Sequence, residues 1–421
     1  MVAAPASRSA TAARWNEALL AALPAPSGRL APMQQRGRHR LSELPLPGRR
    51  DEAWRFTDLA ALQALDPAAL LAAPSAAAAG PEPAPSSFRL VWDGRRDPLE
   101  AVVLPQGLSP LSEAELQQHL GQILESSGCR GHWPVLLNKA AASQVLALRV
   151  QGTVEPVLEL VSDAGPHATL LPLRVLLLLE EGASLSLLQV HRSSGANLTS
   201  VVVETHLGAG ARLQHGLLAP GHPEAVLLAH LVASQEPGSE LSLVSATAGW
   251  GLSRLEPRLL QPDGGALSRL RSLQLVHDRQ SGDCHSQVEF RGPEGRLDQL
   301  HKVVADGAGR SVFNGAVRVP RQAQRTDASQ LSRSLLLSDR ARVDTKPELE
   351  IVADDVRCAH GATVSRLQQD ELFYLQSRGI AADQAAALLL RGYCEEILAD
   401  LPASAAAWHP LPSLLGHPID R

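Results

Sequence analysis

The motif Gly182-Ala-Ser-Leu185 returns along the chain as Gly210-Ala-Arg-Leu213, Gly238-Ser-Glu-Leu241 and Gly265-Ala-Leu267, and this repeat decides the fold. The four glycines are spaced 28, 28 and 27 residues apart. A nearly constant period of this size is typical of a solenoid, in which no single repeat can bury its own hydrophobic face. We therefore expect one structural coil for each repeat.

The residues between the glycines predict β-strands. Short runs alternate apolar and polar side chains, as in Leu185-Ser-Leu-Leu-Gln-Val190 and Leu270-Arg-Ser-Leu-Gln-Leu-Val276, and Gly, Pro, Asp and Ser separate them. No long helical pattern interrupts these runs before about residue 368. A solenoid made only of strands is a parallel β-helix, and the pattern alone leaves a β-sandwich or β-barrel open. The predicted class is mainly β.

Helical patterns flank the strand region. Trp15, Leu19 and Leu23 recur at helical spacing, and Ser112 with Glu115 forms a capping-box pattern. We predict a mixed, largely helical region over residues 1–149, with an Ala/Pro-rich linker near 66–87. The β-helix core follows over residues 150–366, and a C-terminal helical domain over 367–421.

Composition limits the possible functions. The 421 residues carry a net charge of −5, and the arginines are scattered, so no basic face indicates nucleic-acid binding. The four cysteines contain no CxxC spacing, which indicates a reducing compartment rather than a disulfide framework. The N-terminal residues lack an apolar h-region, so we expect no secretory signal, and the run Val175-Leu-Leu-Leu-Leu179 is far too short to span a membrane. We expect a cytoplasmic protein, or a plastid one if the source is a photosynthetic eukaryote.

The stretch Arg357-Cys-Ala-His-Gly-Ala-Thr-Val-Ser365 contains the strongest candidate site. On an extended strand, Cys358 and His360 point to the same face. A thiolate beside an imidazole suits iron, iron–sulfur or zinc chemistry. Two ligands do not close a metal site, however, and from the residues alone a buried structural cysteine and histidine are the commoner outcome.

The other cysteines and histidines form no legible site. Cys284 and His285 are adjacent, so on a strand they face opposite sides and do not chelate together. Cys129 lies in a loop-like stretch, and Cys394 fits the apolar stripe of a helix. Eight histidines of the strand region include no HxH or HxxxH pair.

The segment Asp370-Glu-Leu-Phe-Tyr-Leu-Gln-Ser-Arg-Gly-Ile380, together with the Cys358–His360 motif, resembles the C-terminal signature of the SufB/SufD family of the SUF iron–sulfur cluster assembly system. Gly361-Ala-Thr363 is similar to the SufD branch, and the residues from Leu46 to Leu59 resemble its N-terminal signature. For Trp54 and Phe56 within that signature we expect local packing. The resemblance implies a right-handed parallel β-helix, in agreement with the repeat.

The resemblance also implies a function. It predicts a non-catalytic scaffold that pairs with SufB through the end of the β-helix, with Cys358 and His360 at the interface where a cluster forms. Their metal binding would be transient, and no cofactor would be bound permanently. There is no GxxxxGK[ST] loop in the sequence, so the energy would come from the ABC-type ATPase SufC.

The C-terminal helix is expected to dock that ATPase. Ala385, Leu389, Tyr393 and Ile397 form one apolar stripe, and a second stripe lies beside it. This surface is wider than one core face requires, and the resemblance places the ATPase contact here. We therefore predict Leu389, Tyr393 and Ile397 as docking residues.

Three alternatives stay open at this stage. A SufB-like scaffold is opposed by the single motif cysteine and by Gly361 after the histidine. A β-helix enzyme acting on polysaccharide would need exposed aromatic residues for sugar stacking, and aromatics make up 3% of the chain. A purely structural protein is the third.

Overall fold

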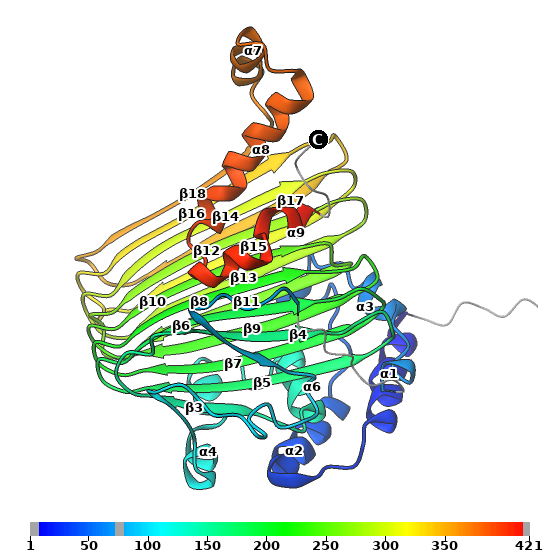
Figure 1. Cartoon of the computed structure of the whole chain (residues 1–421), viewed down its shortest axis with the longest axis vertical. Coiled ribbons are helices and arrows are strands. Elements are labelled where there is room, and N and C mark those ends of the chain that lie inside the picture. The colour runs from blue at the N-terminus through cyan, green and yellow to red at the C-terminus, as the bar shows by residue number, and fades with distance from the viewer. Residues whose placement is uncertain (1–7, 72–79, 416–421) are drawn as a thin grey trace, which may run out of the picture.

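The computed structural model describes residues 8–71 and 80–415, and its centre is a solenoid of two facing sheets (Figure 1). Each coil contributes one strand to each sheet, and every neighbouring pair is parallel except the short β2–β3 pair. This arrangement confirms the predicted parallel β-helix and excludes the sandwich and the barrel. Residues 72–79 of the predicted linker lie outside the described residues.

Sheet 1 has nine strands, whose spatial order is β1 (Ser87–Val91), β4 (Val157–Asp163), β6 (Ser184–Arg192), β8 (Arg212–Pro220), β10 (Glu240–Ala248), β12 (Leu267–Val276), β14 (Arg296–Ala305), β16 (Asp327–Leu336) and β18 (Arg357–Ser365). Sheet 2 also has nine, in the order β17 (Arg342–Ile351), β15 (Arg310–Val319), β13 (Ser281–Phe290), β11 (Leu252–Gln261), β9 (Val226–Gln235), β7 (Leu198–Leu207), β5 (Leu170–Leu179), β3 (Leu146–Val150) and β2 (Leu108–Pro110). The solenoid thus includes strands before residue 150, where the sequence predicted its start.

The repeated glycines occupy the same turn in successive coils. Gly182, Gly210, Gly238 and Gly265 all have φ between 63° and 72°, a conformation that costs glycine little because it has no Cβ. The next two coils place Glu294 and Arg325 at this turn, with φ of 63° and 58°. Their side chains form an ion pair across the coils, with Nη2–Oε1 at 2.6 Å. The glycine repeat therefore ends before the solenoid does.

The solenoid interior combines apolar side chains with buried, hydrogen-bonded polar side chains. The earlier coils fill it with Leu and Val side chains such as Leu158, Leu187 and Val203. In the later coils Gln299, His301 and their neighbours take equivalent inward positions, and they hydrogen-bond one another inside the core. Buried polar pairs also lie in the earlier coils, where His191 Nδ1 and the Ser162 hydroxyl are 2.7 Å apart, so hydrogen-bonded polar groups occur at both ends of the interior.

The N-terminal helices cover the outer face of sheet 2. Apolar side chains of α1 and α6, including Trp15, Leu19 and Leu137, pack with Leu198, Leu228 and other outward residues of the sheet. The capping box predicted at Ser112 is present at the start of α4. The elements of this region are α1 (Arg8–Ala22), η1 (Gly28–Leu30), α2 (Ala31–Ser42), η2 (Glu52–Trp54), α3 (Ala60–Ala64), η3 (Ala69–Leu71), α4 (Glu113–His119), α5 (Gln122–Ser126) and α6 (Trp133–Ala141).

The C-terminal elements cover the outer face of sheet 1. They are α7 (Gln369–Ser377), α8 (Ala382–Leu398), η4 (Ala403–Trp408) and α9 (Pro410–Leu415). The second half of α8, η4 and α9 pack on outward apolar side chains of the strands, such as Leu188 and Leu273. The first half of α8 and all of α7 extend beyond the sheet (Figure 1). None of the described helices is long and apolar enough to cross a lipid bilayer.

Candidate functional site

The solenoid ends in two strands that each lack a neighbour on one side. β18 is the last strand of sheet 1 and β17 the last strand of sheet 2, and no strand of the described residues pairs with their outer edges. They are 9 and 10 residues long. Unpaired edges of this length readily accept a strand of another chain, so soluble proteins seldom leave them uncovered.

Cys358 and His360 lie on this edge strand. Cys358 is half-buried and packs against the solenoid interior, so strand alternation directs His360 to the same inner face. Burial raises the pKa of the Cys358 thiol, so it is protonated at neutral pH until a metal or base displaces the proton. His360 is exposed at the rim. The structure thus gives these two side chains one shared face at an open end.

A polar interior lies directly beneath His360. In register with it on β16 is Gln330, whose amide donates a hydrogen bond of 2.9 Å to Gln299 Oε1 on β14. His301 follows Gln299 on the same inner face of β14. Its Nδ1 and the Ser272 hydroxyl form a hydrogen bond of 2.6 Å, and its ring stacks on that of Phe313. Burial lowers the pKa of His301 to about 3, so it is neutral at physiological pH. The side chains directly below His360 in the interior are therefore polar and hydrogen-bonded, not apolar.

The remaining cysteines are buried. Cys284 faces the interior, where burial raises its pKa to about 12, and His285 faces outward from the same strand, as alternation predicts. Burial likewise raises the pKa of Cys394 to about 12 and also raises that of Cys129. None of these three is a thiolate at neutral pH, so none is an available metal ligand there.

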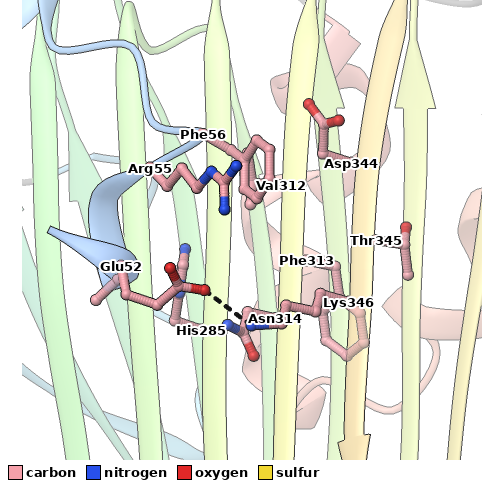
Figure 2. Close-up of a pocket in the computed structure, with 11 residues that line it drawn as sticks. Glu52, Arg55, Phe56, His285, Val312, Phe313, Asn314, Asp344, Thr345 and Lys346 are labelled. Atoms are coloured by element: carbon pink, nitrogen blue, oxygen red, sulfur yellow. Dashed lines mark hydrogen bonds and ion pairs between the residues drawn. The ribbon is translucent and has the colours of Figure 1, made fainter. Parts of the chain in front are cut away.

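A pocket of about 220 Å³ lies on the outer face of sheet 2 beside the edge strand β17. Figure 2 shows Glu52, Arg55 and Phe56 of the N-terminal region facing side chains of β13, β15 and β17 across it. Lys346 Nζ lies 2.6 Å from Glu348 Oε1 and 3.0 Å from Glu52 Oε1. These contacts raise the pKa of Lys346 and lower that of Glu52. No sequence pattern indicates this pocket, because its two walls come from segments far apart in the chain.

The N-terminal signature is anchored beside this pocket. Trp54 is buried and stacks under the Arg254 guanidinium, 3.8 Å from its ring centroid. Thr57 hydrogen-bonds Asp283, and Arg254 Nη1 donates to the Thr57 hydroxyl at 3.1 Å. Phe56 is instead exposed and lines the pocket, which differs from the packing role predicted for it.

The residues predicted to dock an ATPase divide into two groups. Ile397 is 0% exposed, and Tyr393 is half-buried with its hydroxyl donating to Arg333 O at 2.7 Å, so both hold α8 against sheet 1. Leu389 is half-buried on the projecting half of α8. The apolar side chains open to solvent lie earlier than predicted: Phe373 is 71% exposed and Leu388 49%. Sequence periodicity described the width of the apolar surface, but it could not show which part the solenoid covers.

Comparisons with known proteins point to one family. The family described as "SUF system FeS cluster assembly, SufBD core domain" matches residues 161–393, from β4 into α8. A Synechocystis protein named as an iron–sulfur cluster assembly SufBD family protein is 31% identical over 393 residues, 87% of this chain and 86% of that protein.

Two other relatives extend the comparison. The iron–sulfur cluster assembly protein SufD of Escherichia coli is 31% identical over 297 residues, 69% of this chain and 67% of its own length. Protein ABCI7, chloroplastic, of Arabidopsis thaliana is 38% identical over 236 residues, 54% of this chain and 49% of its own length. These matches favour the resemblance read from the C-terminal motifs over the polysaccharide-enzyme alternative.

Proposed function

Because the chain belongs to the SufB/SufD family of SUF-system iron–sulfur cluster assembly proteins, we propose that it is a non-catalytic scaffold subunit of the SufD kind. It pairs with a SufB subunit through the open end of its solenoid. The observation that carries the proposal is the position of Cys358 and His360, which share one face of the unpaired edge strand β18.

The chemistry of these two residues suits transient binding. A thiolate and an imidazole are ligands for iron, and two of them leave the coordination of a cluster iron incomplete. The partner subunit would supply the remaining ligands. A ligand set divided between two chains holds the cluster as cargo and releases it when the interface changes. The raised pKa of Cys358 opposes premature metal binding, because the proton must leave first.

His360→Ala in the complex with SufB and SufC tests this proposal. The substituted chain should assemble with both partners but carry less than half of the iron and acid-labile sulfide. Thr363→Ala is the matched control, because Thr363 lies on the same strand and faces the other side. An intact His360→Ala complex with undiminished iron, sulfide and cluster transfer would contradict the proposal.

A SufB-like role is the second candidate within the family. It predicts that this chain alone, after anaerobic reconstitution with iron and sulfide, retains a cluster through gel filtration. The SufD-like role predicts that the cluster is lost unless SufB is present. The absorbance of the eluted protein at visible wavelengths distinguishes the two.

ATPase docking is the second part of the proposal. The projecting half of α8 together with α7 carries Phe373, Tyr374 and Leu388 as exposed apolar side chains, with Leu389 beside them. Apolar groups concentrated on one projecting segment mark a protein-binding surface. We assign this segment to SufC, because the second half of α8 is already occupied by sheet 1.

Paired charge substitutions test the docking segment. Phe373→Asp combined with Leu388→Asp should reduce co-purification of SufC at least tenfold, while the circular dichroism and melting temperature of the chain stay unchanged. Gln376→Asp adds a charge to an exposed polar position of the same helix and serves as the control. Normal recovery of SufC with the double variant would place the ATPase elsewhere.

A further inference from the structure

A second group of metal-ligating side chains lies far from the open end, beneath the start of α6. His230 on β9 and Glu256 on β11 are neighbours in register, and both point outward from sheet 2. His132, the residue that precedes α6, reaches them from the N-terminal region. One ligand atom from each of the three residues lies within 4.8 Å of the other two.

The distances suit coordination of one ion. Glu256 Oε2 lies 3.3 Å from His132 Nδ1 and 3.1 Å from His230 Nε2. Ligands held 2.0–2.1 Å from a tetrahedral zinc ion are separated from one another by about 3.3 Å. The two separations that involve Glu256 are therefore already close to those of metal-bound ligands, and all three atoms lie within 4.8 Å of one another.

His230 lacks a hydrogen-bond partner that would account for its burial. It is 1% exposed, and neither of its ring nitrogens makes a hydrogen bond within the described part of the chain. The short separation from Glu256 is a contact without the directed geometry of a hydrogen bond. A buried polar group without a partner is costly, and a metal ion would remove that cost.

Glu256 is held as an anion in a fixed orientation. His132 Nδ1 lies within hydrogen-bond distance of its Oε2, and Arg254 forms a buried ion pair with its Oε1. Arg254 Nε donates to Glu256 Oε1 at 2.7 Å, which leaves Oε2 facing the histidines. Such outer contacts orient the ligands of metal sites.

Two arginines near Glu256 would repel a metal cation, but each of them also contacts another residue. Arg254 Nη1 also contacts Asp283 Oδ2 at 3.2 Å. Arg258 lies 3.3 Å from Glu256 Oε2, but its shorter contact is with Gln287 Oε1 at 2.6 Å. An ion would displace only the longer of the two Arg258 contacts.

We propose that His132, His230 and Glu256 bind one divalent first-row transition-metal ion, Zn²⁺ or Fe²⁺. Two imidazoles and one carboxylate are the protein ligands of many zinc sites and of mononuclear non-haem iron(II) sites. Water completes the coordination from the side of His132, whose side chain is 33% exposed. Because His132 belongs to the N-terminal region and the other two to the solenoid, the ion ties the start of α6 to sheet 2.

The test uses the full-length chain carrying Cys358→Ser and His360→Ala, so that metal at the open end does not contribute. After treatment with a chelator, the protein is titrated with Zn²⁺, with Fe²⁺ under anaerobic conditions, and with Co²⁺ as an optical probe. We expect one ion per chain, visible ligand-field absorption from Co²⁺ and a melting temperature raised by several degrees. The metal with the larger shift identifies the preferred ion.

Substitutions localise the site. His132→Gln changes a partly exposed residue, leaves the buried pair in place and should weaken binding at least tenfold; Glu256→Gln should abolish it. The control is His206→Gln, because His206 lies 3.2 Å from Glu236 in an exposed pair that has no third ligand. A chain that binds no ion, or whose His132→Gln variant binds as tightly as its parent, would show that the three residues form only an ion-paired clamp. That result overturns the proposal and leaves the role of the open end untouched.

Discussion

The two ends of the solenoid are built differently. At the N-terminal end the outermost strands are β1, with 5 residues, and β2, with 3. At the C-terminal end they are β17, with 10 residues, and β18, with 9. Short edge strands protect a sheet from pairing with other chains, whereas long ones invite it. The first end of the solenoid therefore has short edge strands, and the second has two long ones that no described strand covers.

The interior is closed at only one of these ends. Trp92, which follows β1, is buried, and Leu99, Val102 and Leu104 pack with it against the apolar core. At the other end Val364 on β18 is 56% exposed, although it follows Cys358 and His360 along the same inner face. We therefore expect the apolar plug to stabilise the free chain and the rim to contribute little to its stability.

The largest expected effect concerns the plug. Trp92→Ala should lower the free energy of unfolding by about 3–5 kcal/mol, because it removes a large buried side chain and leaves a cavity. Val364→Ala, the equivalent truncation at the open rim, should change it by no more than about 0.5 kcal/mol. Urea-induced unfolding of both variants measures the contrast. Similar losses for the two variants would show that the two ends of the interior are closed to the same degree.

Acid should weaken both halves through their buried histidines. Burial lowers the pKa of His191 to about 3 and of His215 to about 4 in the earlier coils, and that of His301 to about 3 in the later ones. The pKa of an unfolded histidine is about 6.5, so below that pH the unfolded state binds protons that the folded state refuses. Stability is therefore complete above pH 6.5 and is lost as the pH falls towards 4.

The expected loss of unfolding free energy for each buried histidine is large enough to measure. At pH 5 each such histidine costs about 2 kcal/mol relative to neutral pH. His301→Gln should make the loss between pH 7.5 and pH 5 smaller by about that amount. An unchanged pH dependence of the unfolding free energy would mean that His301 is protonated inside the fold.

Blocking the open edge should affect pairing more than folding. The Arg357 N–H donates to the carbonyl of Thr326, the residue before β16, so alternation along a parallel strand directs the N–H groups of Cys358, His360 and Ala362 to the free edge. Ala362→Pro removes one of these edge donors and should weaken the proposed SufB complex at least tenfold, about 1.4 kcal/mol.

The matched control for the edge is Thr363→Pro, which removes a donor to β16 by the same alternation. It should destabilise the free chain itself, whereas Ala362→Pro should leave its melting temperature nearly unchanged. Affinities from titration calorimetry with SufB decide the matter. Full affinity of the Ala362→Pro chain would indicate that the subunits do not join by strand pairing.

The smallest expected effect is that of His360→Ala on the isolated chain. His360 is exposed, so the free energy of unfolding should change by less than about 0.5 kcal/mol. Gln330→Ala, one coil deeper, removes a buried hydrogen bond to Gln299 and should cost about 1–3 kcal/mol. A large loss for His360→Ala would mean that this residue stabilises the free chain and is not reserved for a complex.

The repeat revealed most of the fold, because its glycines are required by the local backbone conformation. A turn with positive φ favours glycine whatever surrounds it, and four consecutive coils have a glycine at this turn. At Glu294 and Arg325 the same turn has no glycine and carries an exposed ion pair between two coils. The sequence of one repeat does not reveal such a pair. The later coils were therefore predictable from alternation but not from the period.

The site was partly predictable for a similar reason. Strand alternation placed Cys358 and His360 on one face, and helical periodicity found the apolar surface of α8. Whether a face is covered depends on a neighbour elsewhere in the chain, so the burial of Ile397 and the exposure of Leu388 could not be read from their helix.

Local rules thus determined the strands, the glycine turns, the capping box and the shared face of the Cys358–His360 motif, since each depends on residues a few positions apart. Lateral neighbours were decided by the tertiary structure alone. His230 and Glu256 are 26 residues apart, whereas Asp327 and Arg357 in a later coil are 30 apart, so no single period locates the residue in the next coil. His132 reaches the same place from outside the repeat. Burial of the chain's apolar surface brings such residues together, and their spacing in the sequence therefore carries no sign of it.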